Sequence, residues 1–271
     1  HLLQGLNEEQ CKQLESEFKE FNEKTDWGTS PIPISIGVVD SGLGGLPFIT
    51  HVNGADLIYL AVGAPLSLKK REEIHSVTCN AVSFLVAQGV KAIVLACNTM
   101  SAVSLEELHK IFPNIPIIGT IAAGARLAVS ATRNKKIGVL ATAVTINSGA
   151  YQNALADSEV FTAIFTPGII NLIEEKGNIS REEFEQEVGE SIAHLIAQGI
   201  DTLILGCTHY AYVKEYIKEK IGPNIALIDP IEEVAQEFKA ALNRRGLEEI
   251  RETETTRRIV LYTNTTYTDS F

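Results

Sequence analysis

Two segments of the chain repeat one pattern, and each copy contains a cysteine near its end. Residues 83–99 read SFLVAQGVKAIVLACNT, residues 193–209 read AHLIAQGIDTLILGCTH, and the matching cysteines are Cys97 and Cys207. In each copy, apolar residues at helical spacing lead to a glycine, and a short apolar run follows. This pattern predicts an amphipathic helix that stops at the glycine, then a buried parallel strand with the cysteine at its carboxyl end. The chain therefore contains a duplicated unit that carries a thiol.

The strand that opens each half of the chain is also repeated. Residues 35–39 read SIGVV and precede a glycine-rich stretch, whereas residues 136–140 read KIGVL and precede the hydroxyl-rich residues 142–145. In open α/β sheets, ligands bind beyond the carboxyl ends of the strands, where such loops lie. We predict an α/β fold of two pseudo-symmetric domains, with mostly parallel sheets flanked by helices and the active site in the cleft between them.

The repetition also predicts the domain boundaries. An apolar stripe with a capping pattern indicates an N-terminal helix over residues 7–24, which includes Cys11. The apolar residues 259–262 are too few for a domain and are expected to form a strand that completes the first sheet. The expected units are an N-terminal helical extension and linker over 1–33, a first α/β domain over 34–121 plus 231–271, and a second over 122–230.

Composition narrows the classes of function. The chain has 271 residues, 45% of them hydrophobic, with a formal net charge of −11 and a pI near 5.1. This charge opposes non-specific binding to nucleic acid and to anionic membranes, so we expect neither partner and favour a small-molecule ligand. No apolar run reaches the roughly eighteen residues of a membrane span, and the first residues lack a signal-peptide pattern. Four cysteines without a CxxC pair indicate reduced thiols, as in a cytoplasm.

Several chemistries could account for cysteines at strand ends. A thiol near a helix N-terminus or an acid–base partner can transfer protons near neutral pH, and two opposed thiols could serve the two faces of one carbon. The cysteines could instead be small buried hydrophobes, although the polar pairs Asn98-Thr99 and Thr208-His209 beside them argue against packing alone. Zinc binding by Cys97, Cys207 and His209 would lack both a zinc-knuckle spacing and a fourth ligand.

Two further enzyme classes fit less well. A cysteine nucleophile with His209 as its base would need a second residue to orient the histidine, and it would leave the duplicated cysteine unexplained. A dinucleotide-binding loop at Gly42-Leu43-Gly44 would require a small residue where the chain has Pro47. Proton transfer by paired thiols is therefore the preferred interpretation.

Four motifs, in order, resemble those of bacterial glutamate racemases. They are Asp40-Ser41-Gly42-Leu43-Gly44-Gly45-Leu46, Ala96-Cys97-Asn98-Thr99, residues 142–145 with Ser148-Gly149-Ala150-Tyr151, and Gly206-Cys207-Thr208-His209-Tyr210. The resemblance runs from about residue 34 to the C-terminus. It implies an amino acid racemase without cofactor or metal, which interconverts L- and D-glutamate to supply peptidoglycan precursors for the cell wall. The implied partner is a small acidic amino acid substrate, and a homodimer is the assembly considered.

The resemblance also implies roles for single residues. Cys97 would take the α-proton of the D-enantiomer with help from Asp40, Cys207 would take that of the L-enantiomer with help from His209, and Glu174 would be a further acidic residue of the site. The amino and carboxylate groups of the substrate would be held by Ser41, Asn98, Thr99, Thr142, Thr145 and Thr208. Alternatives stay open, because Asp40 could cap the following helix, His209 could be structural, and Glu174 could lie on a solvated helical face.

One segment departs from the family pattern. The family has Asp-Thr-Ala-Arg leading to Pro-Tyr-Gly after its second strand, whereas residues 59–67 here read YLAVGAPLS, without the acid, the Arg or the Tyr. Pro65, Leu66 and Ser67 stand where contacts to the substrate are expected, and the basic residues 69–71 either replace a lost contact or form a solvated helix face. Three hypotheses follow: a glutamate racemase with a variant pocket, a two-thiol racemase or isomerase for another amino acid such as aspartate, and a non-catalytic regulatory protein on a racemase frame.

Overall fold

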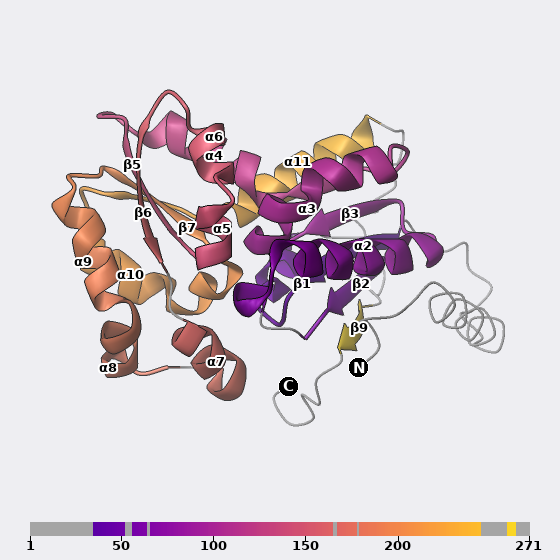
Figure 1. Ribbon diagram of the computed structural model, residues 1–271, viewed down its shortest axis with the longest axis horizontal. Helices are drawn as coiled ribbons and strands as arrows, with labels where there is room; N and C mark the ends of the chain where they lie inside the picture. Colours follow the sequence, from indigo (N-terminus) through magenta and orange to yellow (C-terminus); the bar gives the residue numbers. More distant parts are fainter. Residues whose placement is uncertain are drawn as a thin grey trace.

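The computed structural model describes residues 35–51, 56–63, 66–164, 167–177, 179–244 and 259–263. The helix expected over 7–24 and the expected substrate contact Pro65 lie outside these ranges. Within them, the chain forms two lobes, each built around a parallel sheet, as Figure 1 shows. The predicted α/β class with two parallel sheets is confirmed.

The first sheet has five strands in the order β4-β3-β1-β2-β9. Every neighbouring pair is parallel, and β9 pairs with β2, which confirms that the closing apolar segment completes this sheet. Its strands are β1 (Ser35–Asp40), β2 (Asp56–Ala61), β3 (Ala92–Leu95), β4 (Ile117–Gly119) and β9 (Ile259–Thr263).

Helices cover both faces of the first sheet. Side chains of a strand alternate between its faces, so Ile36 and Val38 of β1 pack with Phe238 on one face, whereas Val39 packs with Leu85 on the other. Burial on both faces explains why these strands read as continuous apolar runs. The covering helices are α2 (Arg71–Ala87), α3 (Asn98–Ile111) and α11 (Ile231–Asn243), and the short 3-10 helices η1 (Leu46–His51) and η2 (Leu66–Leu68) follow β1 and β2.

The second sheet has four parallel strands in the order β6-β5-β7-β8. They are β5 (Lys136–Ala141), β6 (Glu159–Ile164), β7 (Thr202–Gly206) and β8 (Ala226–Ile228). The helical elements of this lobe are α5 (Ala143–Asn147), α6 (Ala150–Ala154), α7 (Pro167–Lys176), α8 (Arg181–Phe184), the π-helix η3 (Glu185–Gly189), α9 (Glu190–Ala197), the 3-10 helix η4 (Thr208–Val213) and α10 (Lys214–Ile221).

The sequence repeat is also a repeat of packing. Gly89 and Gly199 follow the ends of α2 and α9 with φ of 76° and 75°, a left-handed conformation that favours glycine and stops each helix. At the opening strands, a Cβ on Gly37 would lie 2.7 Å from Leu85 Cδ1, and a Cβ on Gly138 would lie 2.7 Å from Ile200 Cδ1. In both strands, a side chain in place of the glycine would force the facing Leu85 or Ile200 to shift.

Helix α4 (Thr120–Ala131) joins the two lobes. Its Ile121, Ala125 and Ala128 pack in a core of the second lobe, whereas Ala123 packs in the core beneath α11. The expected boundary between 121 and 122 falls inside this helix, and the domain limits stay a prediction. Among the described helices, none is long and apolar enough to cross a lipid bilayer.

Candidate active site

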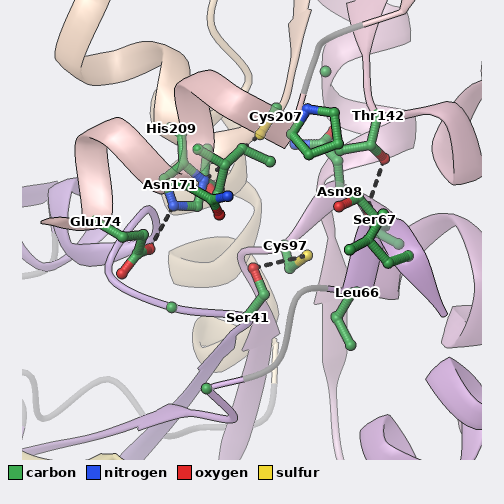
Figure 2. Close-up of a pocket in the computed structure, with 18 residues that line it drawn as sticks. Ser41, Leu66, Ser67, Cys97, Asn98, Thr142, Asn171, Glu174, Cys207 and His209 are labelled. Atoms are coloured by element: carbon green, nitrogen blue, oxygen red, sulfur yellow. Dashed lines mark hydrogen bonds and ion pairs between the residues drawn. The ribbon is translucent and has the colours of Figure 1, made fainter. Parts of the chain in front are cut away.

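A cavity of about 320 Å³ lies where loops from the two sheets meet. Cys97 follows β3 and Cys207 follows β7, so each lobe contributes one thiol to the same cavity (Figure 2). A space of this size suits a small-molecule ligand. The expected site residues that line it are Ser41, Leu66, Ser67, Cys97, Asn98, Thr99, Thr142, Glu174, Cys207, Thr208 and His209. Asp40 and Thr145 lie behind this wall, hydrogen bonded to Thr208 and Thr99 respectively.

Cys97 occupies a buried position with weakly polar partners. It is the N-cap residue of α3, is 6% exposed, and donates its thiol proton to Ser41 Oγ at 3.9 Å. Burial raises the pKa of Cys97 to about 12, with a further contribution from the negative charge of Asp40, whereas hydrogen bonds from Met100 N–H and with Ser41 oppose the rise. Cys97 is therefore a neutral thiol, a proton donor, in the ligand-free site.

Cys207 has a base beside it. Its Sγ lies 3.7 Å from His209 Nδ1, and His209 Nε2 lies 2.5 Å from Glu174 Oε1 (Figure 2). Glu174 comes from α7, where its side chain is 16% exposed, and the side chain of His209 is 3% exposed. With its Nε2–H donated to Glu174, the imidazole directs Nδ1 at the sulfur, so it can take the thiol proton.

The charges around His209 favour its cationic form. Burial lowers the pKa of His209, but hydrogen bonds with Cys207 and Glu174 and the negative charges of Cys207 and Asp40 outweigh it, so the pKa rises to about 10. An imidazolium next to Sγ stabilises a thiolate. With His209 and Glu174 beside it, Cys207 is therefore suited to act as a thiolate base that removes a proton from a ligand.

Asp40 holds the glycine-rich loop. Its Oδ2 accepts the N–H of Gly45 at 2.9 Å and of Gly42 at 3.4 Å, and its Oδ1 accepts the hydroxyl of Thr208 at 3.4 Å. Burial raises the pKa of Asp40 to about 6, although the nearby His209 and the two glycine N–H groups lower it. Within the described residues Asp40 makes no hydrogen bond to Cys97, and its backbone bonds go to the loop before η1 rather than to the N–H groups of that helix, so its assistance to Cys97 stays a prediction.

The glycine-rich loop is also held from the second lobe. Leu43 N–H donates to Glu174 Oε1 at 3.0 Å, and Leu43 C=O accepts the hydroxyl of Tyr212 at 3.2 Å. The loop passes so close to that lobe that a Cβ on Gly42 would lie 2.2 Å from Glu174 Oε1. Glycine is therefore required there by close approach, and Glu174 connects the loop to His209.

Hydroxyl groups form the wall between the two cysteine loops. Thr99 Oγ1 lies 2.9 Å from Thr142 Oγ1 and 3.2 Å from Thr145 Oγ1, and the latter two are 2.9 Å apart. The cluster combines one threonine of the first lobe with two of the second, because β3 and β5 end at the same cleft. Such hydroxyls can redirect their protons towards an anionic group.

The structure bears on three points that the sequence left open. Glu174 does not lie on a solvated helical face, because it is bonded to His209 and Leu43. The basic residues 69–71 do not line the cavity. The orienting residue whose absence counted against a cysteine nucleophile is also present, since Glu174 holds His209. The argument against a nucleophile then depends on the duplicated cysteine alone.

Sequence reasoning missed part of the cavity wall. Ile170 and Asn171, for example, line the cavity and lie on α7 four and three positions before Glu174, on the same helical face. That spacing could have identified them once Glu174 was assigned to the site. The missed lining residues are Gly42, Gly63, Leu68, Pro167, Ile170, Asn171 and Gly206. In the described part of the chain, no three His, Cys, Asp or Glu side chains group in a way that could hold a metal ion.

The chain is similar to known glutamate racemases. A family model of Asp/Glu/hydantoin racemases matches residues 61–238. The glutamate racemase of Exiguobacterium sibiricum is 41% identical over 222 residues, which cover 79% of this chain and 81% of that protein. The glutamate racemase of Neisseria meningitidis serogroup A is 38% identical over 221 residues, which cover 78% and 81%.

Solved structures of glutamate racemases are also similar to this chain. A glutamate racemase isoform from Bacillus anthracis superposes with a TM-score of 0.77 and 32% identity, covering 87% of this chain and 90% of that one. The glutamate racemase of Francisella tularensis, in complex with D-glutamate, gives a TM-score of 0.75 and 29% identity, covering 87% and 89%. The resemblance expected from the four motifs is thereby confirmed, and the chain belongs to the glutamate racemase family, within the wider family of Asp/Glu/hydantoin racemases.

Proposed function

We propose that this protein interconverts L- and D-glutamate by proton transfer between Cys97 and Cys207, without an organic cofactor. The observation that carries the proposal is the pair of thiols in one cavity, each from a different sheet and each with different proton partners. Racemisation needs a base on one face of the α-carbon and an acid on the other. The similarity to glutamate racemases supports glutamate as the substrate.

The proton count of the reaction balances without any redox change. In the L-to-D direction, the Cys207 thiolate forms an S–H bond as the α-carbon loses its C–H bond, and the electron pair stays on the carbon and its carboxylate. The Cys97 thiol then gives its proton to the opposite face of that carbon. Cys97 is left as a thiolate and Cys207 as a thiol, which is the state from which the D-enantiomer reacts.

The surrounding groups favour this starting state. His209, whose pKa is raised although burial alone lowers it, supplies a positive charge beside Cys207. Cys97 keeps its proton because burial raises its pKa. Asp40 adds to this effect through its charge, and Glu174 fixes the ring of His209. Glu174 and His209 thus act on Cys207, whereas the charge of Asp40 acts on Cys97 and, through His209, on Cys207.

Negative charge that develops on the substrate needs donors. The lining offers hydroxyls of Ser41, Thr99, Thr142 and Thr208, the amide of Asn98, and the N-terminus of the 14-residue helix α3. Among the described lining residues there is no Lys or Arg. We infer that the two carboxylates of glutamate are bound by hydrogen bonds and helix-end N–H groups, with Thr145 supporting Thr99 and Thr142 from behind.

The second candidate is the same chemistry on another amino acid, such as aspartate. The observation that favours it is the altered segment after β2, because Leu66 and Ser67 stand where the family pattern has Tyr-Gly, and both line the cavity together with the apolar Leu68. A wall of this kind changes the space and the hydrogen bonds available to the distal end of the side chain.

Exchange of the α-proton with solvent tests both candidates. The wild-type protein is incubated in deuterium oxide with L-glutamate, D-glutamate or other amino acids, and deuterium at the α-carbon is followed together with optical rotation. Incorporation and racemisation with glutamate support the first candidate. Turnover of another amino acid with none of glutamate supports the second, and no exchange with any amino acid contradicts both.

Compartment and assembly complete the proposal. Two free thiols are required by this chemistry, and Cys97 and Cys207 are free in the structure, which favours a reducing compartment such as the cytoplasm. The large apolar side chains Ile111, Val129 and Ile164 are 52%, 53% and 51% exposed, so we include a homodimer in the proposal. Sedimentation of the full chain tests it.

A further inference from the structure

Tyr151 of α6 reaches both cysteine loops with one buried side chain. It is 1% exposed, and its hydroxyl donates to Asn98 Oδ1 at 2.8 Å. Its ring lies beside Gly206, where an added Cβ would come within 3.4 Å of the ring carbon Cε2. Asn98 directly follows Cys97 and Gly206 directly precedes Cys207. Tyr151 therefore touches the chain next to each thiol.

The direction of this hydrogen bond fixes the orientation of the Asn98 amide. Burial, followed by the negative charges of Cys207 and Asp229, raises the pKa of Tyr151 well above its ordinary value, so the hydroxyl keeps its proton. A flipped amide would turn its NH₂ group to the hydroxyl, and the phenolic proton would lose its acceptor in a buried position. The Asn98 carbonyl is thus held on Tyr151.

The other end of the amide is then directed to the cavity. Asn98 lines the cavity and is 3% exposed, and Figure 2 shows it at the wall near Thr142. Within the described residues, Asn98 Nδ2 has no hydrogen-bond partner, and this atom is not completely buried. The Nδ2 group is therefore available as a donor to a ligand in the cavity.

We propose that Tyr151 is a positioning residue: it holds the Asn98 amide so that its N–H groups donate to a carboxylate of the amino acid substrate. The inference depends on the proposed function, because it assigns the partner of Asn98 in that reaction. A flipped amide would present its carbonyl oxygen to an anion and repel it. The packing of the same ring on Gly206 keeps the Cys207 loop in register with this donor.

The experiment compares Tyr151→Phe, Asn98→Ala and the double variant in the whole 271-residue chain. Tyr151→Phe removes one hydroxyl, and we expect KM to rise about tenfold for both enantiomers while kcat changes less than about threefold, because the Asn98 amide is no longer held with its N–H groups towards the charged carboxylate. In the Asn98→Ala background, Tyr151→Phe is expected to change KM less than about twofold, since both variants remove the same contact.

Tyr216→Phe is the matched control. Tyr216 also donates its hydroxyl to an oxygen, Ile179 O at 3.4 Å, and neither residue lines the cavity. It should leave KM and kcat near the wild-type values. If the effects of Tyr151→Phe and Asn98→Ala multiply in the double variant, or if Tyr151→Phe lowers Tm without changing KM, the inference is overturned.

A second readout needs no substrate. The side-chain NH₂ signals of Asn98 in a ¹⁵N-labelled protein are assigned by their loss in Asn98→Ala, and they are expected to shift in Tyr151→Phe and to stay in place in Tyr216→Phe. Unchanged Asn98 signals in Tyr151→Phe overturn the inference whatever the activity. A wild-type protein that fails to racemise glutamate, with shifted Asn98 signals, counts instead against the proposed function.

Discussion

The two cysteine loops have the same frame and different chemical surroundings. Both follow a parallel strand and both cysteines are N-cap residues, Cys97 of the α-helix α3 and Cys207 of the 3-10 helix η4. Cys97 faces a hydroxyl, Ser41, whereas Cys207 faces the imidazole of His209. The duplicated unit therefore places two thiols at equivalent positions, after a parallel strand in each lobe. The side chains around each thiol differ, and this difference determines which of the two holds a proton.

The largest effect is expected from removing either thiol. Cys97→Ser and Cys207→Ser should each lower the rate of racemisation by at least about 10³-fold, because a hydroxyl is a far weaker base than a thiolate and general acid–base catalysis contributes on this scale. If the cysteines have opposite faces, Cys97→Ser keeps α-proton exchange only with L-glutamate and Cys207→Ser only with D-glutamate. Deuterium incorporation into each enantiomer measures this.

Cys79 provides the matched control for these variants. It is a third free cysteine, on α2, and its Sγ lies 3.5 Å from His75 Nε2, so it is also paired with a histidine. It does not line the cavity, and Cys79→Ser should racemise within about twofold of the wild-type rate. Equal exchange of both enantiomers in Cys97→Ser would contradict the division of faces between the two thiols.

A smaller effect is expected from removing the histidine and the carboxylate that distinguish the Cys207 loop from the Cys97 loop. His209→Asn removes the charge beside Cys207, and kcat/KM should fall about 100-fold in both directions, because the enantiomers have equal free energy and their kcat/KM values must stay equal. Glu174→Gln keeps an oxygen acceptor for His209 and Leu43, so about tenfold is expected. Rates of racemisation with each enantiomer provide the measurement.

The dependence of activity on pH should also distinguish His209→Asn from the wild-type protein. The pKa of His209, which burial lowers and its partners raise to about 10, means that the cation is present at neutral pH and is lost as the pH rises through about 10. Wild-type activity should fall on that alkaline side, and His209→Asn should lack this limb. A wild-type profile that falls near pH 6.5 instead would show that His209 is not held as a cation.

The smallest effect concerns stability. Burial raises the pKa of Asp40 to about 6, so between its ordinary value of 3.8 and 6 the folded protein binds a proton that the unfolded chain has lost. Stability from this group is full below about pH 4 and is lost as the pH rises to about 6, by about 3 kcal/mol at most. Asn can accept the glycine N–H bonds and donate to Thr208, so Asp40→Asn should raise Tm at pH 8 by several degrees while lowering activity.

Asp201 directly precedes β7, at the end of the strand away from Cys207, and provides a control because its pKa is shifted in the opposite direction from that of Asp40. Although its partial burial raises its pKa, hydrogen bonds from Thr132, Arg133 N–H and Asn134 N–H outweigh this and lower it. Its stabilisation is present above its ordinary pKa and is lost as the pH falls through the lowered value. Asp201→Asn should therefore lower Tm at pH 8, and a lower Tm for Asp40→Asn as well would contradict the raised pKa of Asp40.

The sequence predicts the frame better than the contacts within it. Strands, helix stops and both cysteine positions follow from apolar runs and glycines that are local in the chain. The bond between Leu43 and Glu174 joins residues 131 positions apart, and that between Asn98 and Tyr151 joins residues 53 apart. Such pairings depend on how the lobes meet, which no local pattern specifies. For this reason Glu174 could be named from a motif while its solvated-face alternative stayed open.

Leu43 links the opening of the cleft to the basicity of the site. Its N–H and C=O are both bonded to the second lobe, to Glu174 and to Tyr212. A ligand that enters by separating the lobes must break these bonds, and Glu174 then loses one of the donors that fix its carboxylate opposite His209. The contact that holds the two lobes together therefore also orients the base beside Cys207.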